Sequence, residues 1–321
     1  MTRASVRAVV KADGYGFGLE RIVRELDGVA DGFVVSDADG LQRLRAITSA
    51  PAATLLDLGP EHAARVVALG GVPNVARRES LTALAARADA ASLVVRVGLR
   101  LAAGWSAIEM DDASSFAAIL ASAGIRVELW THLTNPTTED DDRDRFARFV
   151  AIFRQHGVDD VGEDYEGTAP AASDRAHGTS VRIGVGLFGA GAGACAIGVQ
   201  APILDRLRSD GTLRASYGTD ALHDGTDVMV IRCGYSNGFP RVVRAYRRIL
   251  SVGMQNCIVL GNDVGLAFSL LGPDDDLDEL AAASSILPHQ IVTGLGLAFQ
   301  LQEAQGYART SSRSDNIERR N

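Results

Sequence analysis

Residues 5–18 read SVRAVVKADGYGFG, a mostly apolar run that ends in a lysine and enters a turn. The β-branched residues of Val6–Val10 predict a strand over Ser5–Lys11, so Lys11 would lie at its carboxyl end. The turn has glycine at every second position from 14 to 18, which lets the backbone approach a phosphate closely. A partly desolvated lysine at this place has a lowered pKa and suits Schiff-base chemistry. The alternative from spacing alone is a surface lysine at a strand end.

Strands and helices alternate through about the first 190 residues. The predicted strands are Ser5–Lys11, Gly32–Ser36, Ala53–Leu58, Ser92–Val97, Arg126–His132 and a segment near Val181–Val185. The predicted helices are Leu19–Leu26, Asp39–Ile47, Glu61–Leu69, Ser80–Ala88, Ser114–Ala123 and Asp141–Gln155. This alternation predicts parallel βαβ units and favours a (β/α)8-type barrel, with an open doubly wound sheet as the alternative. Barrel active sites lie at the carboxyl ends of the strands, where Lys11 is expected.

Near residues 189–198 the sequence becomes richer in strands and turns. Further strands are expected at Thr212–Ser216, Asp227–Arg232, Val242–Val252 and Cys257–Leu260, followed by a short helix at Leu277–Ser284. We therefore expect a barrel over residues 1–194, a β-rich C-terminal domain over residues 195–308, and a polar tail over residues 309–321.

Composition and charge exclude several classes of protein. The chain has 321 residues, 46% of them hydrophobic, enough for a sizeable core. With 32 basic and 40 acidic residues the net charge is −8, so no nucleic acid partner is expected. The three cysteines (195, 233 and 257) are widely spaced, which indicates neither a disulfide framework nor a metal site. Because neither a long apolar run nor a signal-peptide pattern is present, we expect a cytoplasmic protein that does not enter a membrane.

The segment Gly184–Gly189 fits the pattern GxGxxG, which opens a helix in dinucleotide-binding proteins. The next residues, AGAGA, make a poor helix start. The acidic residue about 20 positions on, Asp205, lies in a run that we expect to be polar and helical rather than at a strand end. A dinucleotide site is therefore not expected.

Five motifs, in order along the chain, resemble those of the alanine racemases. Residues 8–18, AVVKADGYGFG, resemble the family's AVVKANAYGHG, and residues 130–133, WTHL, resemble its THxA segment. Residues 181–189, VRIGVGLFG, resemble VRxGixLYG, and residues 215–218, ASYG, resemble the VSYG turn. Residues 234–241, GYSNGFPR, resemble GYADGYPR. The likeness extends over about residues 6–295, and five ordered motifs make it far more specific than any one of them.

The resemblance implies an amino-acid racemase that depends on pyridoxal 5′-phosphate (PLP), and it assigns roles by position. Lys11 would bind PLP as a Schiff base and serve as one acid/base. Tyr235 would serve as the other, contributed by the partner subunit of a homodimer. His132 would lie against Tyr235, and Arg182 would donate to the pyridine nitrogen. Racemisation needs two bases on opposite faces of the α-carbon, which a lysine and a tyrosine supply.

The resemblance also implies the residues that hold the phosphate and the substrate. The phosphate would be bound by Tyr15, by the backbone amides near Gly184 and Val185, and by Thr168 as a weaker candidate. On the substrate side, Met254 would help to bind the amino-acid carboxylate. Arg100 is the nearest candidate for the arginine that faces this carboxylate.

The sequence departs from the family on that substrate side. An ungapped match places Ala103 where the family has its substrate-facing arginine, and Arg96 at an often carboxylated lysine. Only ten residues precede Lys11, and the terminal RxPRxY segment is not recognisable, with Tyr307 as a remote substitute. Two alternatives follow. One is a PLP enzyme of the same fold with another amino acid or another reaction, such as decarboxylation. The other is a catalytically weakened PLP-binding protein.

Without the resemblance, each predicted residue has a plainer interpretation. His132 would be a core histidine at a strand end. Arg182 would pair with one of the many carboxylates, and Tyr235 would be an aromatic residue in a turn. Their joint occurrence with Lys11, rather than any single residue, supports the racemase interpretation.

Overall fold

The structure is a computed structural model that describes residues 4–104, 106–133, 137–158, 161–166, 179–191, 194–215, 221–241, 246 and 248–304. The chain forms two compact units. One consists of Met1–Gly14 with Leu19–Gly184, and the other of Tyr15–Gly18 with Val185–Asn321. Each unit contains its own sheet.

The sheet of the first unit is parallel and closes into a barrel. The strands described there are β1 (Ser5–Val9), β2 (Gly32–Val35), β3 (Ala52–Thr54), β4 (Val94–Leu99), β5 (Arg126–His132), β6 (Val161–Glu166) and β7 (Ser180–Ile183). Their order is β3-β2-β1-β7-β6-β5-β4. Ala53 pairs with Val72 and Asn74 pairs with Arg96, so residues 72–74 join the two outer strands, β3 and β4. The ring therefore has eight members and no free edge, which confirms the predicted (β/α)8-type barrel.

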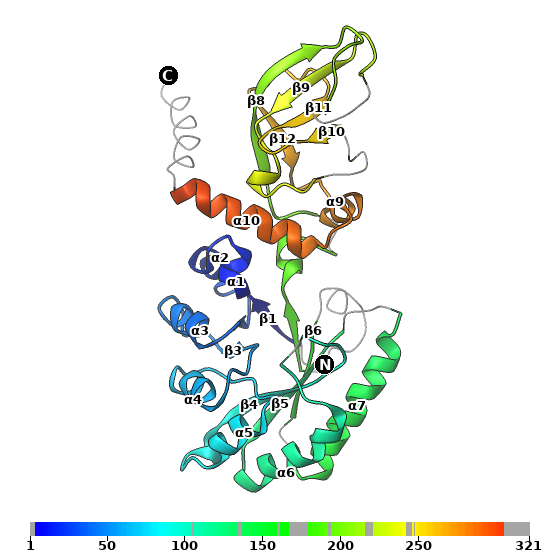
Figure 1. Cartoon of the computed structure of the whole chain (residues 1–321). Helices are drawn as coiled ribbons and strands as arrows, with labels where there is room; N and C mark the ends of the chain where they lie inside the picture. The colour runs from blue at the N-terminus through cyan, green and yellow to red at the C-terminus, as the bar shows by residue number, and fades with distance from the viewer. Residues whose placement is uncertain are drawn as a thin grey trace. The chain divides into compact units, whose positions relative to one another are not determined.

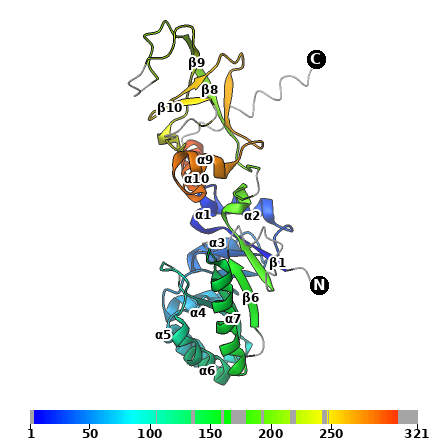
Figure 2. The same cartoon turned by 90° about the vertical axis from the view of Figure 1, so that its right-hand side faces the viewer.

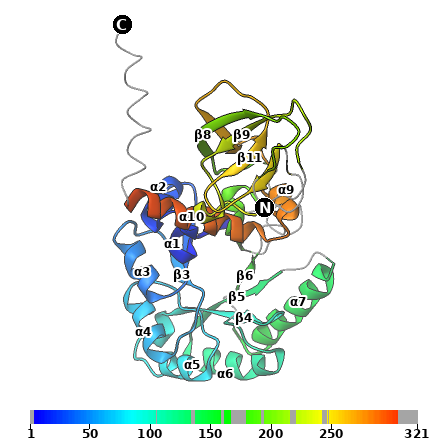
Figure 3. The same cartoon turned by 45° about the horizontal axis from the view of Figure 1, so that its top comes forward.

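Helices cover the outside of this barrel. They are α2 (Leu19–Leu26), α3 (Ala38–Arg45), α4 (Pro60–Ala68), α5 (Arg78–Ala85), α6 (Ala113–Ala123) and α7 (Glu139–Gln155). Figures 1 and 3 show α3 to α7 following one another around the strands. In α7 one apolar face is buried, because Phe146, Phe149 and Phe153 recur at helical spacing and are inaccessible to solvent. Each helix is thus placed by an apolar stripe that packs onto the strands.

The second unit is built on an antiparallel sheet, which confirms the predicted β-rich C-terminal domain. Its strands are β8 (Val199–Arg208), β9 (Asp227–Ile231), β10 (Ile249–Val252), β11 (Cys257–Leu260) and β12 (Ala267–Leu271), in the order β10-β11-β9-β8-β12. Two helices, α9 (Leu277–Ser284) and α10 (Pro288–Ala304), follow the sheet along the chain and are in contact with each other (Figure 2).

The short segment Tyr15–Gly18 belongs to this second unit because it packs against α10. Gly16 has φ +84°, and a Cβ atom there would lie 2.7 Å from the backbone nitrogen of Leu297. Gly296 is equally confined, because its Cβ would lie 2.3 Å from the carbonyl oxygen of Tyr15. Two glycines thus allow the two backbones to touch.

Several elements differ from the predictions. β6, β8, β12 and the segment 72–74 are absent from the predicted strands, and α10 is absent from the predicted helices. The expectation that Asp205 lies in a helical run was wrong, because it lies in β8. Most side chains of β8 are solvent-exposed, and this explains its polar sequence.

Two further differences concern predicted strands. In the described part of Thr212–Ser216 we find only an isolated bridge from Arg214 to Ala221. Of the predicted strand Val242–Val252, the last four residues form β10, whereas 242–245 and 247 lie outside the described residues.

Within the described ranges, no single helix is long and apolar enough to cross a membrane. One bent pair, Leu277–Ser284 with Pro288–Leu301, passes the same test by length and composition only, with a bend of 99°.

Candidate active site

Lys11 follows the carboxyl end of β1 and lines a cavity of about 250 Å³. Ser36 and Asp37, which follow β2, line the same cavity. The pKa of Lys11 is lowered, first by burial and then by the positive charge of Arg182. A lowered pKa increases the fraction of neutral amine, which is the nucleophilic form. Lys11 therefore has the position and the protonation behaviour of a covalent anchor.

The turn that follows Lys11 is left-handed. Residues 12–15 have φ angles between 52° and 63°, and only one of the four is glycine. For other residues this conformation costs about 1–2 kcal/mol each. Asp13 holds the turn, because its Oδ1 accepts from the backbone nitrogen of Leu19 at 3.0 Å and from Arg43 at 2.6 Å. Strain of this kind is concentrated at functional sites, and here it presents Lys11 from a fixed backbone.

The interior of the barrel contains a network of charged side chains. Arg7 on β1 donates two hydrogen bonds to Glu128 on β5, at 2.6 and 2.8 Å. Arg96 on β4 lies 3.4 Å from Glu128 and donates to Asp164 on β6 at 2.6 Å. Nε of Arg182, on β7, lies 2.8 Å from the same Asp164 oxygen. In two of these four pairs, Arg7–Glu128 and Arg96–Asp164, the strands are not neighbours in the sheet, so these side chains meet across the barrel interior. Barrel interiors are normally filled by branched apolar residues, so this network is unusual.

Trp130 fills the space beside these charges. The guanidinium carbon of Arg182 lies 4.7 Å from the centre of the Trp130 ring, and that of Arg96 lies 5.6 Å away. The indole nitrogen donates to Asn74 Oδ1 at 2.8 Å. Gly98 makes room for the ring, because a Cβ atom there would lie 2.3 Å from it. The guanidinium of Arg182 is thus held by an aromatic surface and a carboxylate together.

His132 is the last residue of β5 and is half-buried. Burial lowers its pKa to about 4, with further lowering by Arg182 and Lys11. At neutral pH the imidazole is therefore uncharged, so it can accept one hydrogen bond and donate another. It can orient a neighbouring hydroxyl group, but it supplies no positive charge.

In the second unit, Tyr235 and Met254 lie on two loops that touch. The backbone nitrogen of Tyr235 donates to Gly253 O at 3.0 Å, and Ser236 donates to Met254 O through both its backbone nitrogen and its hydroxyl. Tyr235 begins the short helix η4 (Tyr235–Asn237), and its side chain is 42% exposed. Met254 is 53% exposed. The predicted acid/base and the predicted substrate-binding residue thus share one exposed patch of this unit.

Tyr15 is buried in the second unit. Its ring lies 5.2 Å from that of Phe188 and 6.4 Å from that of His289. Burial raises the pKa of its hydroxyl group. The phenol therefore stays protonated and can serve as a hydrogen-bond donor, as a phosphate ligand requires.

The remaining predicted residues are Arg100 on the substrate side and Gly184, Val185 and Thr168 on the phosphate side. Arg100 follows β4, and its guanidinium donates to the carbonyl of Ala107 at 3.2 and 2.5 Å and lies 3.4 Å from Glu109. Gly184 follows β7, and Val185 begins the short helix η3 (Val185–Phe188) in the other unit. Thr168 lies outside the described residues.

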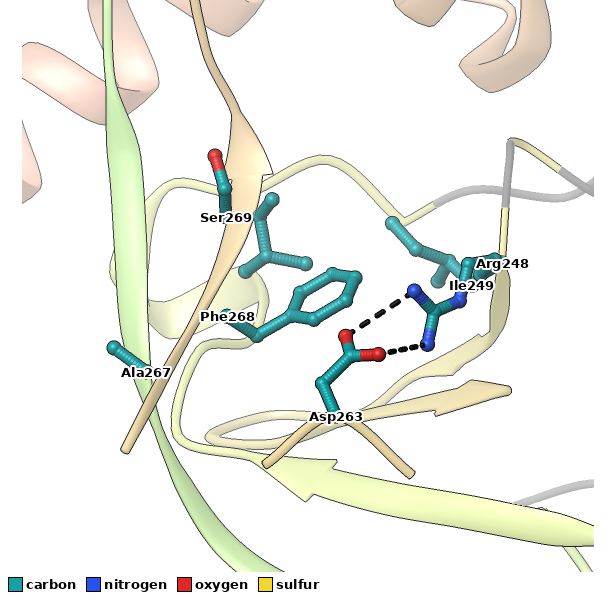
Figure 4. Close-up of a pocket in the computed structure, with 7 residues that line it drawn as sticks. Arg248, Ile249, Asp263, Ala267, Phe268 and Ser269 are labelled. Atoms are coloured by element: carbon teal, nitrogen blue, oxygen red, sulfur yellow. Dashed lines mark hydrogen bonds and ion pairs between the residues drawn. The ribbon is translucent and has the colours of Figure 1, made fainter. Parts of the chain in front are cut away.

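A separate cavity of about 420 Å³ lies at β10 and β12 of the second unit (Figure 4). There Arg248 pairs with both carboxylate oxygens of Asp263 at 3.1 Å and lies over the ring of Phe268. Its described lining residues include none of those predicted for the active site, whereas the cavity of the first unit includes Lys11.

Sequence reasoning missed the charged network around Arg182. Arg96 is noted only as a departure from the family, and Glu128 and Asp164 have no assigned role. One signal was available: parallel barrel strands usually read as continuous apolar runs, yet β4, β5 and β6 each carry buried or partly buried charge. Charge in such a strand indicates a polar interior.

The chain is similar to known proteins in sequence. The profile of the family described as "Alanine racemase, N-terminal domain" matches residues 1–192. The chain is 27% identical to the alanine racemase of Rhodospirillum rubrum, over 92% of this chain and 88% of that protein. It is 30% identical to the alanine racemase of Corynebacterium efficiens, over 77% of this chain and 72% of that protein.

It is also similar to solved structures. The alanine racemase from Acinetobacter baumannii matches with a TM-score of 0.78 at 16% identity, over 91% of this chain and 90% of that one. The alanine racemase from Bartonella henselae, solved with covalently bound pyridoxal phosphate, matches with a TM-score of 0.71 at 19% identity, over 92% of both chains. At these identities the structures establish the shared fold.

Proposed function

Because this chain belongs to the alanine racemase family, we propose that it is a PLP-dependent racemase that interconverts the L and D forms of alanine or a similar amino acid. The observation that carries the proposal is Lys11, the only lysine in the sequence, which lines a cavity at the carboxyl ends of β1 and β2. Its pKa is lowered by burial and by Arg182.

The residues present fit PLP. Lys11 offers an amine of lowered pKa for covalent attachment, and Arg182 offers a buried, fixed guanidinium as donor to the ring nitrogen. Tyr15 offers a protonated hydroxyl group for the phosphate. The backbone amides of Gly184 and Val185, and Thr168, are further proposed phosphate ligands. When bound, PLP acidifies the α-hydrogen of an amino acid by delocalising the negative charge left behind.

Two residues of this chain then move the proton. Lys11 would take or return it on one face of the α-carbon, and Tyr235 would do so on the other. The exposure of Tyr235 on its own unit supports a role toward a partner subunit, so we propose a homodimer with shared sites. His132, neutral at pH 7, would accept or donate a hydrogen bond that orients the tyrosine.

The substrate side favours a second candidate, a racemase of the same fold for an amino acid other than alanine. Met254 would bind the carboxylate, but the guanidinium of Arg100 is engaged by Ala107 and Glu109. A lost charged hydrogen bond to a carboxylate costs about 1.5–3 kcal/mol, or roughly tenfold to a hundredfold in affinity. A change of this size is enough to alter which amino acid is preferred.

The test is incubation of the purified protein with PLP and a panel of L-amino acids, followed by separation of the enantiomers. We expect a visible absorption band on adding PLP, its removal by borohydride with label on the Lys11 peptide, and formation of at least one D-amino acid. Lys11→Ala should abolish all three. A band that persists in Lys11→Ala, or binding without any racemisation, would refute the assignment as a racemase.

A further inference from the structure

Asp164 occupies a special place in the charged network of the barrel. Its side chain is 1% exposed, and a single oxygen, Oδ2, contacts both Arg96 at 2.6 Å and Arg182 at 2.8 Å. Glu128, the other carboxylate of the network, has its closest contacts with Arg7 and Arg96 instead. Of these two carboxylates, Asp164 is the one in direct contact with Arg182.

A buried ion network of this kind needs a reason. Bringing charged groups out of water is energetically costly, and apolar residues of similar volume often replace such pairs without loss of stability. Three arginines face two carboxylates here, which leaves one excess positive charge (3 − 2 = +1) among the five groups. Stability alone does not explain why a barrel interior holds them.

The contacts around Arg182 restrict how its guanidinium can move. Asp164 lies at Nε, and the ring of Trp130 lies 4.7 Å from the guanidinium carbon. The planar group is therefore fixed in both position and tilt. Asp164 itself is fixed by the hydrogen bond that its Oδ2 accepts from Arg96.

We propose that Asp164 is a positioning residue, which aims the guanidinium of Arg182 at the ring nitrogen of PLP, and that Arg96 serves to hold Asp164 in place. This inference rests on the proposed function, because it assumes that PLP binds at Lys11. In this proposal Arg96 and Asp164 do not touch the cofactor. Both act on it through the position of Arg182.

If Asp164 served only the stability of the barrel, its loss would affect PLP binding only through unfolding. A double variant that keeps the net charge of the network separates this structural role from the positioning role. Asp164→Asn alone leaves buried positive charge uncompensated and should lower the urea midpoint of unfolding. The double variant Arg96→Gln/Asp164→Asn removes one charge of each sign and keeps the excess at one (2 − 1 = +1). Its stability should recover toward that of the wild type. Both variants remove the contact between the Asp164 carboxylate and Arg182.

The readouts are the apparent Kd for PLP and the visible absorption spectrum of the bound cofactor, measured together with the urea midpoint. We expect the double variant to be stable yet to bind PLP about tenfold to a hundredfold more weakly, with a shifted band. Glu128→Gln is the matched control, because it removes a carboxylate from the same network but leaves Asp164 on Arg182. It should keep Kd within about threefold of the wild-type value.

Wild-type affinity and an unshifted band in a stable double variant would overturn the positioning role. The same holds if Glu128→Gln weakens PLP binding as much as the double variant does, because the effect would then follow any disruption of the network and not the loss of Asp164 in particular. Absence of PLP binding in the wild type would refute the proposed function, and this inference with it. If the wild type binds PLP and only the results expected for the variants are not observed, the positioning role of Asp164 is refuted and the proposed function is not.

Discussion

Lys11 is the only lysine in the sequence, so its amine can be observed without interference. A protein labelled with ¹³C-lysine gives a single Cε signal, whose chemical shift follows the protonation of Nζ. We predict that this signal titrates below 10.5 in the folded, cofactor-free protein, because burial and Arg182 both disfavour the charged amine. The same sample unfolded in urea should titrate near 10.5.

The variant Arg182→Gln tests the cause of this shift. Removing the nearby positive charge should raise the pKa of Lys11 toward its ordinary value, while the contribution from burial stays. Arg248→Gln, in the second unit, is a control that should leave the signal unchanged, because Arg248 does not contribute to the shift. Identical titration of the native and unfolded wild type would show that the amine is not desolvated.

Among single residues, the sequence predicts those that stand in a linear motif. Lys11 is predicted because a strand and a turn flank it directly, and Arg182 and His132 are predicted because they lie in segments that resemble motifs of the alanine racemases. Asp164 and Glu128 are different, because their importance comes from contacts with Arg96 and Arg182 on other strands. Such contacts depend on the register between strands that are far apart in sequence. A local sequence pattern does not predict this register.

At the scale of elements, α5 is held by a residue outside the helix. Its N-terminal flank, Arg77, offers no side-chain oxygen for capping. Asp57, buried after β3, supplies one instead: Oδ2 accepts from the backbone nitrogens of Ala76 and Arg77 at 2.9 and 2.8 Å, and Oδ1 accepts from Ser80 Oγ at 2.8 Å. One carboxylate thus connects the third barrel strand to the start of α5.

We predict that Asp57→Asn lowers the free energy of unfolding by about 1.5–3 kcal/mol, because an amide cannot accept at both positions and buried donors lose their partner. The change should appear as a lower urea midpoint at unchanged m-value. Asp89→Asn is the control, because Asp89 forms a bidentate pair with Arg87 at the exposed surface and should contribute little. Equal midpoints for the wild type and Asp57→Asn would mean that α5 does not need this cap.

The elements themselves are predicted where local patterns are strong. The amphipathic helices and the apolar strands β1, β2 and β5 follow from hydrophobic periodicity. Residues 72–74 were not predicted as a strand because they form only isolated bridges, to β3 on one side and to β4 on the other. β8 was not predicted because most of its side chains are exposed to solvent. Its sequence therefore lacks the alternation of apolar and polar residues by which a strand is recognised.

At the scale of the whole molecule, the residues proposed for catalysis and binding are divided between the two units. Lys11, His132 and Arg182 belong to the barrel unit, whereas Tyr15, Tyr235 and Met254 belong to the unit with the antiparallel sheet. Racemisation as proposed requires Lys11 and Tyr235 to act on one α-carbon from opposite faces. We propose that the two come from different subunits of a homodimer, so a mixture of two inactive variants should regain activity.

The experiment mixes Lys11→Ala with Tyr235→Phe in equal amounts under conditions that allow subunits to exchange. Random pairing makes half of the dimers mixed, and each mixed dimer has one site with both native residues and one with neither. Half of the sites in half of the dimers, or about a quarter of all sites, should therefore be active. Exchange is demonstrated separately by native mass spectrometry with one variant isotopically labelled. If mixed dimers form and no activity returns, Lys11 and Tyr235 do not act together across subunits, and a site completed within one chain becomes the better account.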